Sequence, residues 1–300
     1  MGIKKQNKIV KKSNALIRCQ WEIESLWEPR LVAILASKVT VDDEDFYVYE
    51  IPISEILGLG YSGRDSAELS NVVDRVMSRV ITVYDGDGRG WTKYNVFSRC
   101  RYKPRKGLLE LGFHPDLKPH YLNLKEKFTQ YSLSEFMSLP STYSQRLYEI
   151  LKSWDDRTEV ELSLEELFEM LDVPESLRLN FAFFRRRVLE QAKKDIVDRA
   201  GSTLFFDWEP LKKGRAGKVV AVRFVLDWKK AQEMTKNQPT DEVFITTTLQ
   251  RESNRCFESK QRAGKRCAPK PKAARCKFCL ERGRMYAQKI VDENQGKLPL

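Results

Sequence analysis

The order of the predicted elements limits the fold of this chain most strongly, because the same order occurs twice. Apolar residues at helical spacing mark the helices, and alternating β-branched and aromatic residues mark the strands. The first copy is predicted to contain a helix, a strand, a short helix, a longer helix, a hairpin and a further strand, over residues 25–39, 46–54, 54–60, 66–80, 81–102 and 107–115. Its hairpin turns at "DGDGRG".

The second copy repeats this order closer to the C-terminus. It is predicted to contain a helix, a short strand entering a capped helix, a longer helix and a hairpin that turns at "KKGRAGK", over residues 141–154, 160–171, 180–201 and 203–226. Ser54 and Ser163 begin the matching short helices about 110 residues apart, which suits one small domain that was duplicated. Three helices followed by a two-stranded hairpin are typical of a winged helix-turn-helix. We therefore expect an α+β fold of tandem winged-helix domains; a generic α+β pair without a DNA role is the alternative.

The longer helix of the second copy, "NFAFFRRRVLEQAKKDIVDRAG" (180–201), has two distinct faces. On a wheel of 100° per residue, Phe184, Val188, Ala192 and Ile196 lie within about 60° of Phe181 and form the predicted buried stripe. The opposite face carries the basic residues Arg186, Arg187, Lys193 and Lys194. Arginine suits guanine edges and phosphates, so this face is predicted to contact DNA.

Three other residues of this helix have their own predicted roles. Arg185 falls near the apolar edge of the wheel and is expected to reach outward to a phosphate. Glu190 falls within the basic face, where it either accepts from a cytosine amino group or holds Arg187 and Lys194 in position. Phe183 faces outward, and either packing on the hairpin or contact with a thymine methyl group would explain it.

The equivalent helix of the first copy is nearly balanced in charge. Its outward face offers Asn71, Asp74, Arg75, Ser78 and Arg79. The first domain is therefore expected to bind the DNA backbone, through Arg75 and Arg79, or another protein, and the second is expected to recognise sequence.

Net charge is concentrated at the two ends of the chain. The 300 residues carry a net charge of +11, of which residues 1–18 hold +6 and residues 251–284 hold +9. Basic ends favour a polyanionic partner or serve as solvated tails. We predict a basic N-terminal arm (1–18), two domains (19–134 and 135–230) and a basic C-terminal tail (231–300). No apolar run is long enough for a membrane helix, so a cytoplasmic location is expected.

The C-terminal tail contains four of the six cysteines. Cys276 and Cys279 form a CxxC pair, and together with Cys256 and Cys267 they could complete a closed tetrahedral zinc site. The gaps before this pair are irregular, and a disordered basic tail with free thiols is equally compatible with the pattern. A structural Zn²⁺ is therefore a hypothesis, and no other cofactor is expected.

Several enzyme classes lack the residues they require. "GRAGK" is too short for a P-loop, and His114 and His120 are too far apart for the histidine pair of a DNA nickase. "DGDGRG" resembles the start of a calcium loop, but Val96 stands where the bidentate glutamate belongs. The sequence predicts a protein that is not an enzyme.

Five segments, in order, resemble the iteron-binding plasmid replication initiator proteins. The segments cover the first helix of each copy, the stretch joining the copies and the helix-turn-helix of the second copy, namely Lys11–Leu31, His114–Phe136, Thr142–Leu151, Leu162–Leu171 and Phe181–Ile196. The resemblance spans residues 11–226, and the remaining C-terminal extension has no counterpart that we identify.

The resemblance implies that two winged-helix domains bind directly repeated sites, the iterons, at a plasmid origin in a bacterial cytoplasm. It implies that the bound protein helps to open the duplex and recruits the host initiator protein and replicative helicase. A dimer joined through the first domain would repress its own gene at an inverted repeat. The basic residues of the second hairpin would lie along phosphates, namely Lys212, Lys213, Arg215 and Lys218. A winged-helix transcriptional regulator or partition-type DNA-binding protein is the alternative.

Overall fold

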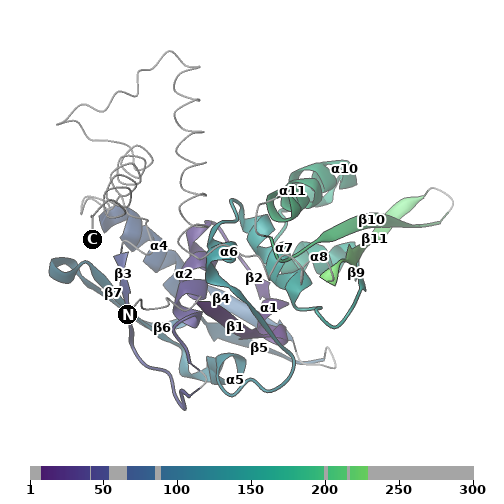
Figure 1. The fold of residues 1–300 in the computed structure, drawn as a ribbon. Helices are drawn as coiled ribbons and strands as arrows, with labels where there is room; N and C mark the ends of the chain where they lie inside the picture. Colours follow the sequence, from purple (N-terminus) through teal and green to yellow (C-terminus); the bar gives the residue numbers. More distant parts are fainter. Residues whose placement is uncertain are drawn as a thin grey trace, which may run out of the picture.

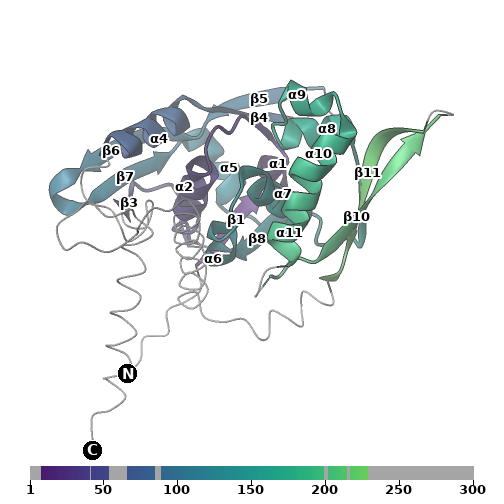
Figure 2. The ribbon, with the colours of Figure 1, turned by 90° about the horizontal axis from the view of Figure 1, so that it is seen from above.

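The computed structural model describes residues 8–40, 42–53, 66–84, 89–198, 202–214 and 217–228. Elements up to α6 form one group and elements from α7 onward form a second group beside it, in both views of the chain (Figure 1 and Figure 2). The predicted short helix over 54–60 and the basic C-terminal tail lie outside the described residues. Within the described residues, no helix is long and apolar enough to cross a bilayer.

The first group combines helices with antiparallel strand pairs. Its elements are β1 (Ile9–Ser13), α1 (Asn14–Ile17), β2 (Gln20–Trp21), α2 (Trp27–Ala36), β3 (Tyr49–Pro52), α4 (Ser66–Ser78), β4 (Val80–Tyr84), β5 (Trp91–Asn95), β6 (Phe97–Lys103), η1 (Pro104–Lys106), β7 (Leu108–Phe113), η2 (Pro115–Leu117), α5 (Lys118–Tyr121), β8 (Phe128–Ser132) and α6 (Leu133–Met137). The strands form sheets in the orders β2-β4-β5, β3-β7-β6 and β1-β8. The predicted first hairpin is present as β4 and β5, with Tyr84 opposite Trp91.

A second hairpin in this group differs from the sequence prediction. The segment after β5 continues into β6, which turns through η1 and pairs with β7. Gly107 makes this turn possible because it adopts φ +61°, a left-handed conformation that favours glycine. The strand β3, which is shorter than the predicted 46–54, pairs with β7 rather than with the β4–β5 hairpin.

Residues 9–17 also differ from the predicted N-terminal arm. They form β1 and α1, and β1 pairs along its length with β8. Val10 is fully buried, and Lys12 is only 3% exposed. Lys12 and the apolar residues beside it are therefore part of the folded domain, so the prediction that a basic arm over residues 1–18 precedes the first domain is wrong for this stretch.

The second group follows the predicted order closely. Its elements are α7 (Thr142–Lys152), β9 (Glu159–Ser163), α8 (Leu164–Met170), α9 (Glu175–Arg178), α10 (Phe181–Phe184), η3 (Arg185–Glu190), α11 (Gln191–Val197), β10 (Phe206–Lys213) and β11 (Lys218–Leu226). The strands form one antiparallel sheet in the order β10-β11-β9. α11 packs against α7, so the longer helix is attached to the first helix of this group.

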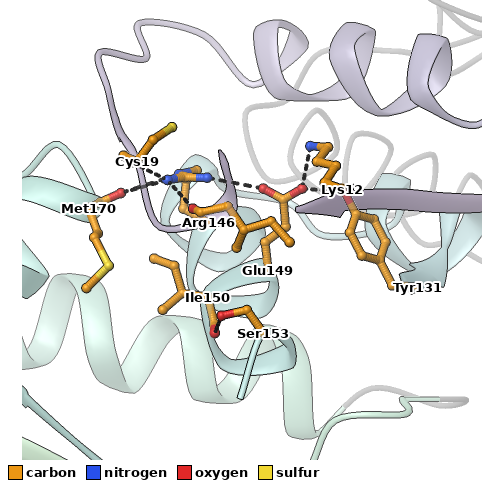
Figure 3. Close-up of polar contacts among 9 residues, drawn as sticks. Lys12, Cys19, Tyr131, Arg146, Glu149, Ile150, Ser153 and Met170 are labelled. Carbon is orange, nitrogen blue, oxygen red and sulfur yellow. Dashed lines mark hydrogen bonds and ion pairs between the residues drawn. The ribbon is translucent and has the colours of Figure 1, made fainter. Parts of the chain in front are cut away.

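A buried ionic network joins the two groups (Figure 3). The Arg146 guanidinium on α7 donates to the carbonyls of Ile17 and Cys19 at 2.9 and 3.0 Å, and to Glu149 at 3.2 Å. Lys12 on β1 donates to the other oxygen of Glu149 at 2.6 Å, and the Tyr131 hydroxyl on β8 donates to the same oxygen. Each buried charge thus has a partner of opposite sign at the boundary between the groups, which compensates the cost of burial.

Candidate DNA interface

Two side-chain caps position the helix-turn-helix of the second domain. Ser163 accepts from the backbone N–H of Glu166, whose carboxylate accepts from the backbone N–H of Ser163, so a capping box begins α8. Asp172 turns the chain with φ +51° after α8. The Asn180 side chain accepts from Ala182 N–H at 2.9 Å and begins α10. These local signals were visible in the sequence for α8, and the structure confirms the capped helix.

The helix from Phe181 to Val197 is continuous but changes its hydrogen bonding in the middle. Residues 185–190, the segment η3, are π-helical, and they lie between α10 and α11. The predicted stripe of Phe184, Val188, Ala192 and Ile196 is buried, which confirms that part of the prediction. Leu189, next to Val188, is fully buried too. The wider π turn brings two consecutive side chains to the core, which a wheel of 100° per residue does not anticipate.

The π-helical segment also changes the partner of Glu190. One of the two predicted roles of Glu190 was to hold Arg187 and Lys194, but its carboxylate lies 3.1 Å from the Arg185 guanidinium. In a π-helix the i→i+5 hydrogen bond places residues five apart on the same side. That part of the prediction is therefore wrong, and Arg185 is paired within its own helix.

The outward face of this helix keeps three basic side chains without an acidic partner. Arg186, Arg187 and Lys194 are exposed, and within the described residues none of them forms an ion pair. Lys193 differs, because its ammonium group donates to Asp207 of β10 at 2.7 Å. This hydrogen bond from Lys193 holds the pKa of Asp207 below its usual value. The free positive charge therefore lies around Arg186, Arg187 and Lys194.

An open depression of about 520 Å³ lies beside these arginines. It is bounded by residues of α7, α9 and the longer helix and by Pro174 just before α9; the full set is Tyr143, Pro174, Ser176, Leu177, Arg186, Arg187 and Gln191. Arg186 and Arg187 thus face a concave surface that also carries the Tyr143, Ser176 and Gln191 polar groups. Tyr143 and Ser176 were not predicted from the sequence, because no local pattern links α7 and α9 to the basic face.

The hairpin of β10 and β11 extends from the body of the domain beside α10 and α11 (Figure 1 and Figure 2). Lys212, Lys213 and Lys218 are exposed near its tip, and Arg215 lies outside the described residues. Gly214 and Gly217 turn the chain with φ +78° and +63°. The base of the hairpin is held by Arg223, which pairs with Glu161 of β9 and Glu209 of β10 at 2.6 and 2.7 Å.

In the first domain, Arg75 and Arg79 form ion pairs with acidic residues. Arg79 is 14% exposed and lies 2.5 Å from Glu24, 3.3 Å from Glu28 and 3.6 Å from Glu22. Arg75 lies 3.6 Å from Glu28. DNA contact by these two arginines stays a prediction, and it would require them to leave carboxylates that already neutralise them.

The predicted metal ligands belong to the C-terminal tail. Cys256, Cys267, Cys276 and Cys279 lie outside the described residues, so the hypothesis of a zinc site stays a prediction. Within the described residues, no group of three or more His, Cys, Asp and Glu side chains could hold a metal ion.

Two family models match this chain in succession. The model described as initiator replication protein, WH1, matches residues 9–152, and the model described as initiator Rep protein, WH2, matches residues 163–226. The chain belongs to the initiator replication protein family. The two copies of the sequence repeat are therefore the tandem winged-helix domains of an initiator, which confirms the predicted fold class and the resemblance. The WH1 match includes α7, which the sequence pattern placed in the second domain.

A solved structure has the same fold as this initiator. It is described as the "Crystal structure of Pi initiator protein in complex with iteron DNA", and it matches with a TM-score of 0.58 and 18% sequence identity. The match covers 74% of this chain and 98% of the other. At this identity the likeness concerns the arrangement of the two domains and not individual contacts.

Proposed function

We propose that this initiator starts plasmid replication by binding iterons at the origin, and that its second domain recognises their sequence. The observation that carries this proposal is the face of the longer helix where Arg186, Arg187 and Lys194 are exposed and unpaired, beside a projecting basic hairpin. The N-terminal part of such a helix contacts base edges in the major groove, and arginine is suited to guanine O6 and N7. Arg185, paired with Glu190, and the hairpin residues Lys212, Lys213, Arg215 and Lys218 would contact phosphates.

The test is binding of the full-length protein to DNA from either side of its gene. We expect tight binding to direct repeats of about 20 base pairs, or two helical turns, and weak binding to shuffled DNA of the same composition. Replacing Arg186→Ala together with Arg187→Ala should weaken specific binding by about 1–3 kcal/mol for each base that these arginines recognise.

A matched control separates base recognition from loss of charge. Arg105 and Lys106 are exposed at the turn between β6 and β7, on the other domain. The double substitution Arg105→Ala with Lys106→Ala removes the same charge and should leave sequence preference unchanged. Specific binding that survives the change at Arg186 and Arg187 would assign recognition to another element.

The remaining parts of the proposal concern partners and location. The bound initiator would act without enzymatic chemistry in the bacterial cytoplasm, help to open the duplex and recruit the host initiator protein and replicative helicase. A dimer would repress the gene of the initiator at an inverted repeat. Copurification of the helicase on origin DNA would test its recruitment. Size measurements with and without iterons would test the dimer.

We also propose a structural Zn²⁺ held by Cys256, Cys267, Cys276 and Cys279. Four thiolates close a tetrahedral site, which would order the tail without supplying catalysis. Metal analysis should then find one zinc per chain, and substitution of Cys276→Ser with Cys279→Ser should remove it. Less than about half an equivalent of zinc in the unsubstituted protein would refute the site.

A further inference from the structure

The three phenylalanines at the start of the longer helix have different environments. Phe184 is fully buried, and Phe181 is partly buried and packs against the core. Phe183 is 48% exposed and belongs neither to the core nor to the apolar residues packed on it. Burial in the hydrophobic core therefore does not account for Phe183. Folding gains little from a phenylalanine at this position, since half of its surface stays in water.

Phe183 also contacts the basic face directly. The guanidinium carbon of Arg186 lies 5.8 Å from the centre of the Phe183 ring, within the range of a cation–π contact. The two side chains are one helical turn apart, and both are exposed. An apolar group and a planar cation are thus held side by side at the end of the helix that contacts base edges in helix-turn-helix proteins.

The two groups are close enough together to reach neighbouring base pairs. Successive base pairs are about 3.4 Å apart along the helix axis, so 5.8 Å lies between one and two steps. The thymine C5-methyl is the apolar group that the major groove displays, and guanine presents the N7 and O6 acceptors that fit an arginine fork. A ring beside a guanidinium therefore complements a thymine close to a guanine.

We propose that Phe183 is a specificity-determining residue, whose ring contacts the methyl group of a thymine one or two base pairs from a guanine bound by Arg186. This inference rests on the proposed function, because it requires the longer helix to lie in the major groove. It adds a base preference that charge alone does not supply. Phosphate contacts by Lys194 and the hairpin would act on every sequence alike.

The experiment uses duplexes that the full-length protein selects from a random-sequence pool. Each thymine of the selected site is replaced in turn by deoxyuridine, which removes only the methyl group. For the unsubstituted protein, one thymine near a guanine should show about a fourfold loss of affinity, the factor expected for burying one methyl group. Affinity that is unchanged at every thymine would overturn the proposal.

Protein variants assign that methyl contact to a side chain. Phe183→Ala should bind the thymine and deoxyuridine duplexes equally, whereas Phe183→Leu should retain about half of the effect on a logarithmic scale. Leu179→Ala is the matched control, because Leu179 is 82% exposed just before the helix and should leave the fourfold ratio intact. The decisive quantity is the ratio of the affinities for the thymine and deoxyuridine duplexes. If this ratio persists in Phe183→Ala or disappears in Leu179→Ala, Phe183 does not make the contact.

The same experiment distinguishes this inference from the proposed function on which it rests. Failure of the pool to yield any preferred sequence would reject sequence-specific binding and the role of Phe183 together. A preferred sequence that is insensitive to deoxyuridine would reject the role of Phe183 and leave iteron recognition in place. Circular dichroism of each variant checks that the exposed substitutions leave the helices intact.

Discussion

At the scale of single residues, the count of basic side chains overstates the charge available to DNA. Arg185 is paired with Glu190, Lys193 with Asp207, and Arg79 with three glutamates. Within the described residues, Arg186, Arg187 and Lys194 have no acidic partner. Intramolecular carboxylates compete with phosphates for the same cations, so each pairing lowers the gain from binding DNA.

The Lys193–Asp207 pair provides a direct measure of this competition. Asp207→Asn should release Lys193 for a phosphate, tighten DNA binding at low salt and steepen its salt dependence by about one phosphate contact. Binding isotherms over a salt series would show this. Glu209→Gln is the control, since it removes the same charge from β10 but its partner is Arg223. An equal effect of both substitutions would attribute the change to overall charge instead.

Arg79→Ala should affect stability more than DNA binding. Glu28 is fully buried, and removal of Arg79 would leave its carboxylate with Arg75 and the Ser25 N–H as partners. We expect a loss of about 1–3 kcal/mol in the free energy of unfolding, measured by urea titration. The salt dependence of DNA binding should not change. A shallower salt dependence with unchanged stability would instead place Arg79 on a phosphate, as the sequence suggested.

At the scale of elements, α7 connects the two domains through charged groups rather than apolar packing alone. Burial raises the pKa of Glu149, but Lys12 and Arg146 outweigh burial and hold the pKa below its ordinary value of 4.5. A carboxyl group with a lowered pKa stabilises the fold at pH values above its ordinary pKa. That stabilisation is lost as the pH falls below about 4.5 and through the lowered pKa.

Glu149→Gln should therefore destabilise the protein strongly at neutral pH. Lys12 and Arg146 would remain buried without a counter-charge, which typically costs about 3–5 kcal/mol. Urea unfolding at several pH values should show that the deficit is largest at neutral pH and shrinks under acid conditions. Exposed Glu126→Gln should leave stability within about 0.5 kcal/mol. A deficit that does not vary with pH would mean that packing, not charge, accounts for the loss.

At the scale of the whole molecule, the charge is divided between two folded domains and a basic C-terminal tail. Residues 251–284 carry a net charge of +9, which is most of the +11 of the complete chain. Binding of DNA through clustered positive charge is independent of sequence and depends strongly on the salt concentration. Sequence preference, by contrast, requires contacts with base edges, which we propose for the longer helix of the second domain.

A protein that ends at Lys230 should keep its sequence preference and lose much of its salt dependence. This end point preserves Trp228, whose indole donates to the Arg157 carbonyl at 2.6 Å. Titrations of iteron and shuffled DNA over a salt series should give a shallower slope for both, with an unchanged ratio of affinities at a given salt concentration. Loss of that ratio in the shortened protein would assign base recognition to the tail.

The sequence alone determined the features that depend on neighbouring residues. Apolar spacing placed the buried stripe of the longer helix, Ser163 marked a helix start, and glycine-rich turns marked the β4–β5 and β10–β11 hairpins. Each of these signals acts over a few residues, because caps, turns and amphipathic faces arise from local backbone geometry.

Only the tertiary structure decided which side chains meet. The sheet brought Asp207 to Lys193, and the pairing of β1 with β8 buried Lys12 beside Glu149. Lys12 and Glu149 are 137 residues apart in the chain, so no periodicity connects them. The energy of such pairs depends on distance and burial in space, and both quantities exist only once the chain has folded.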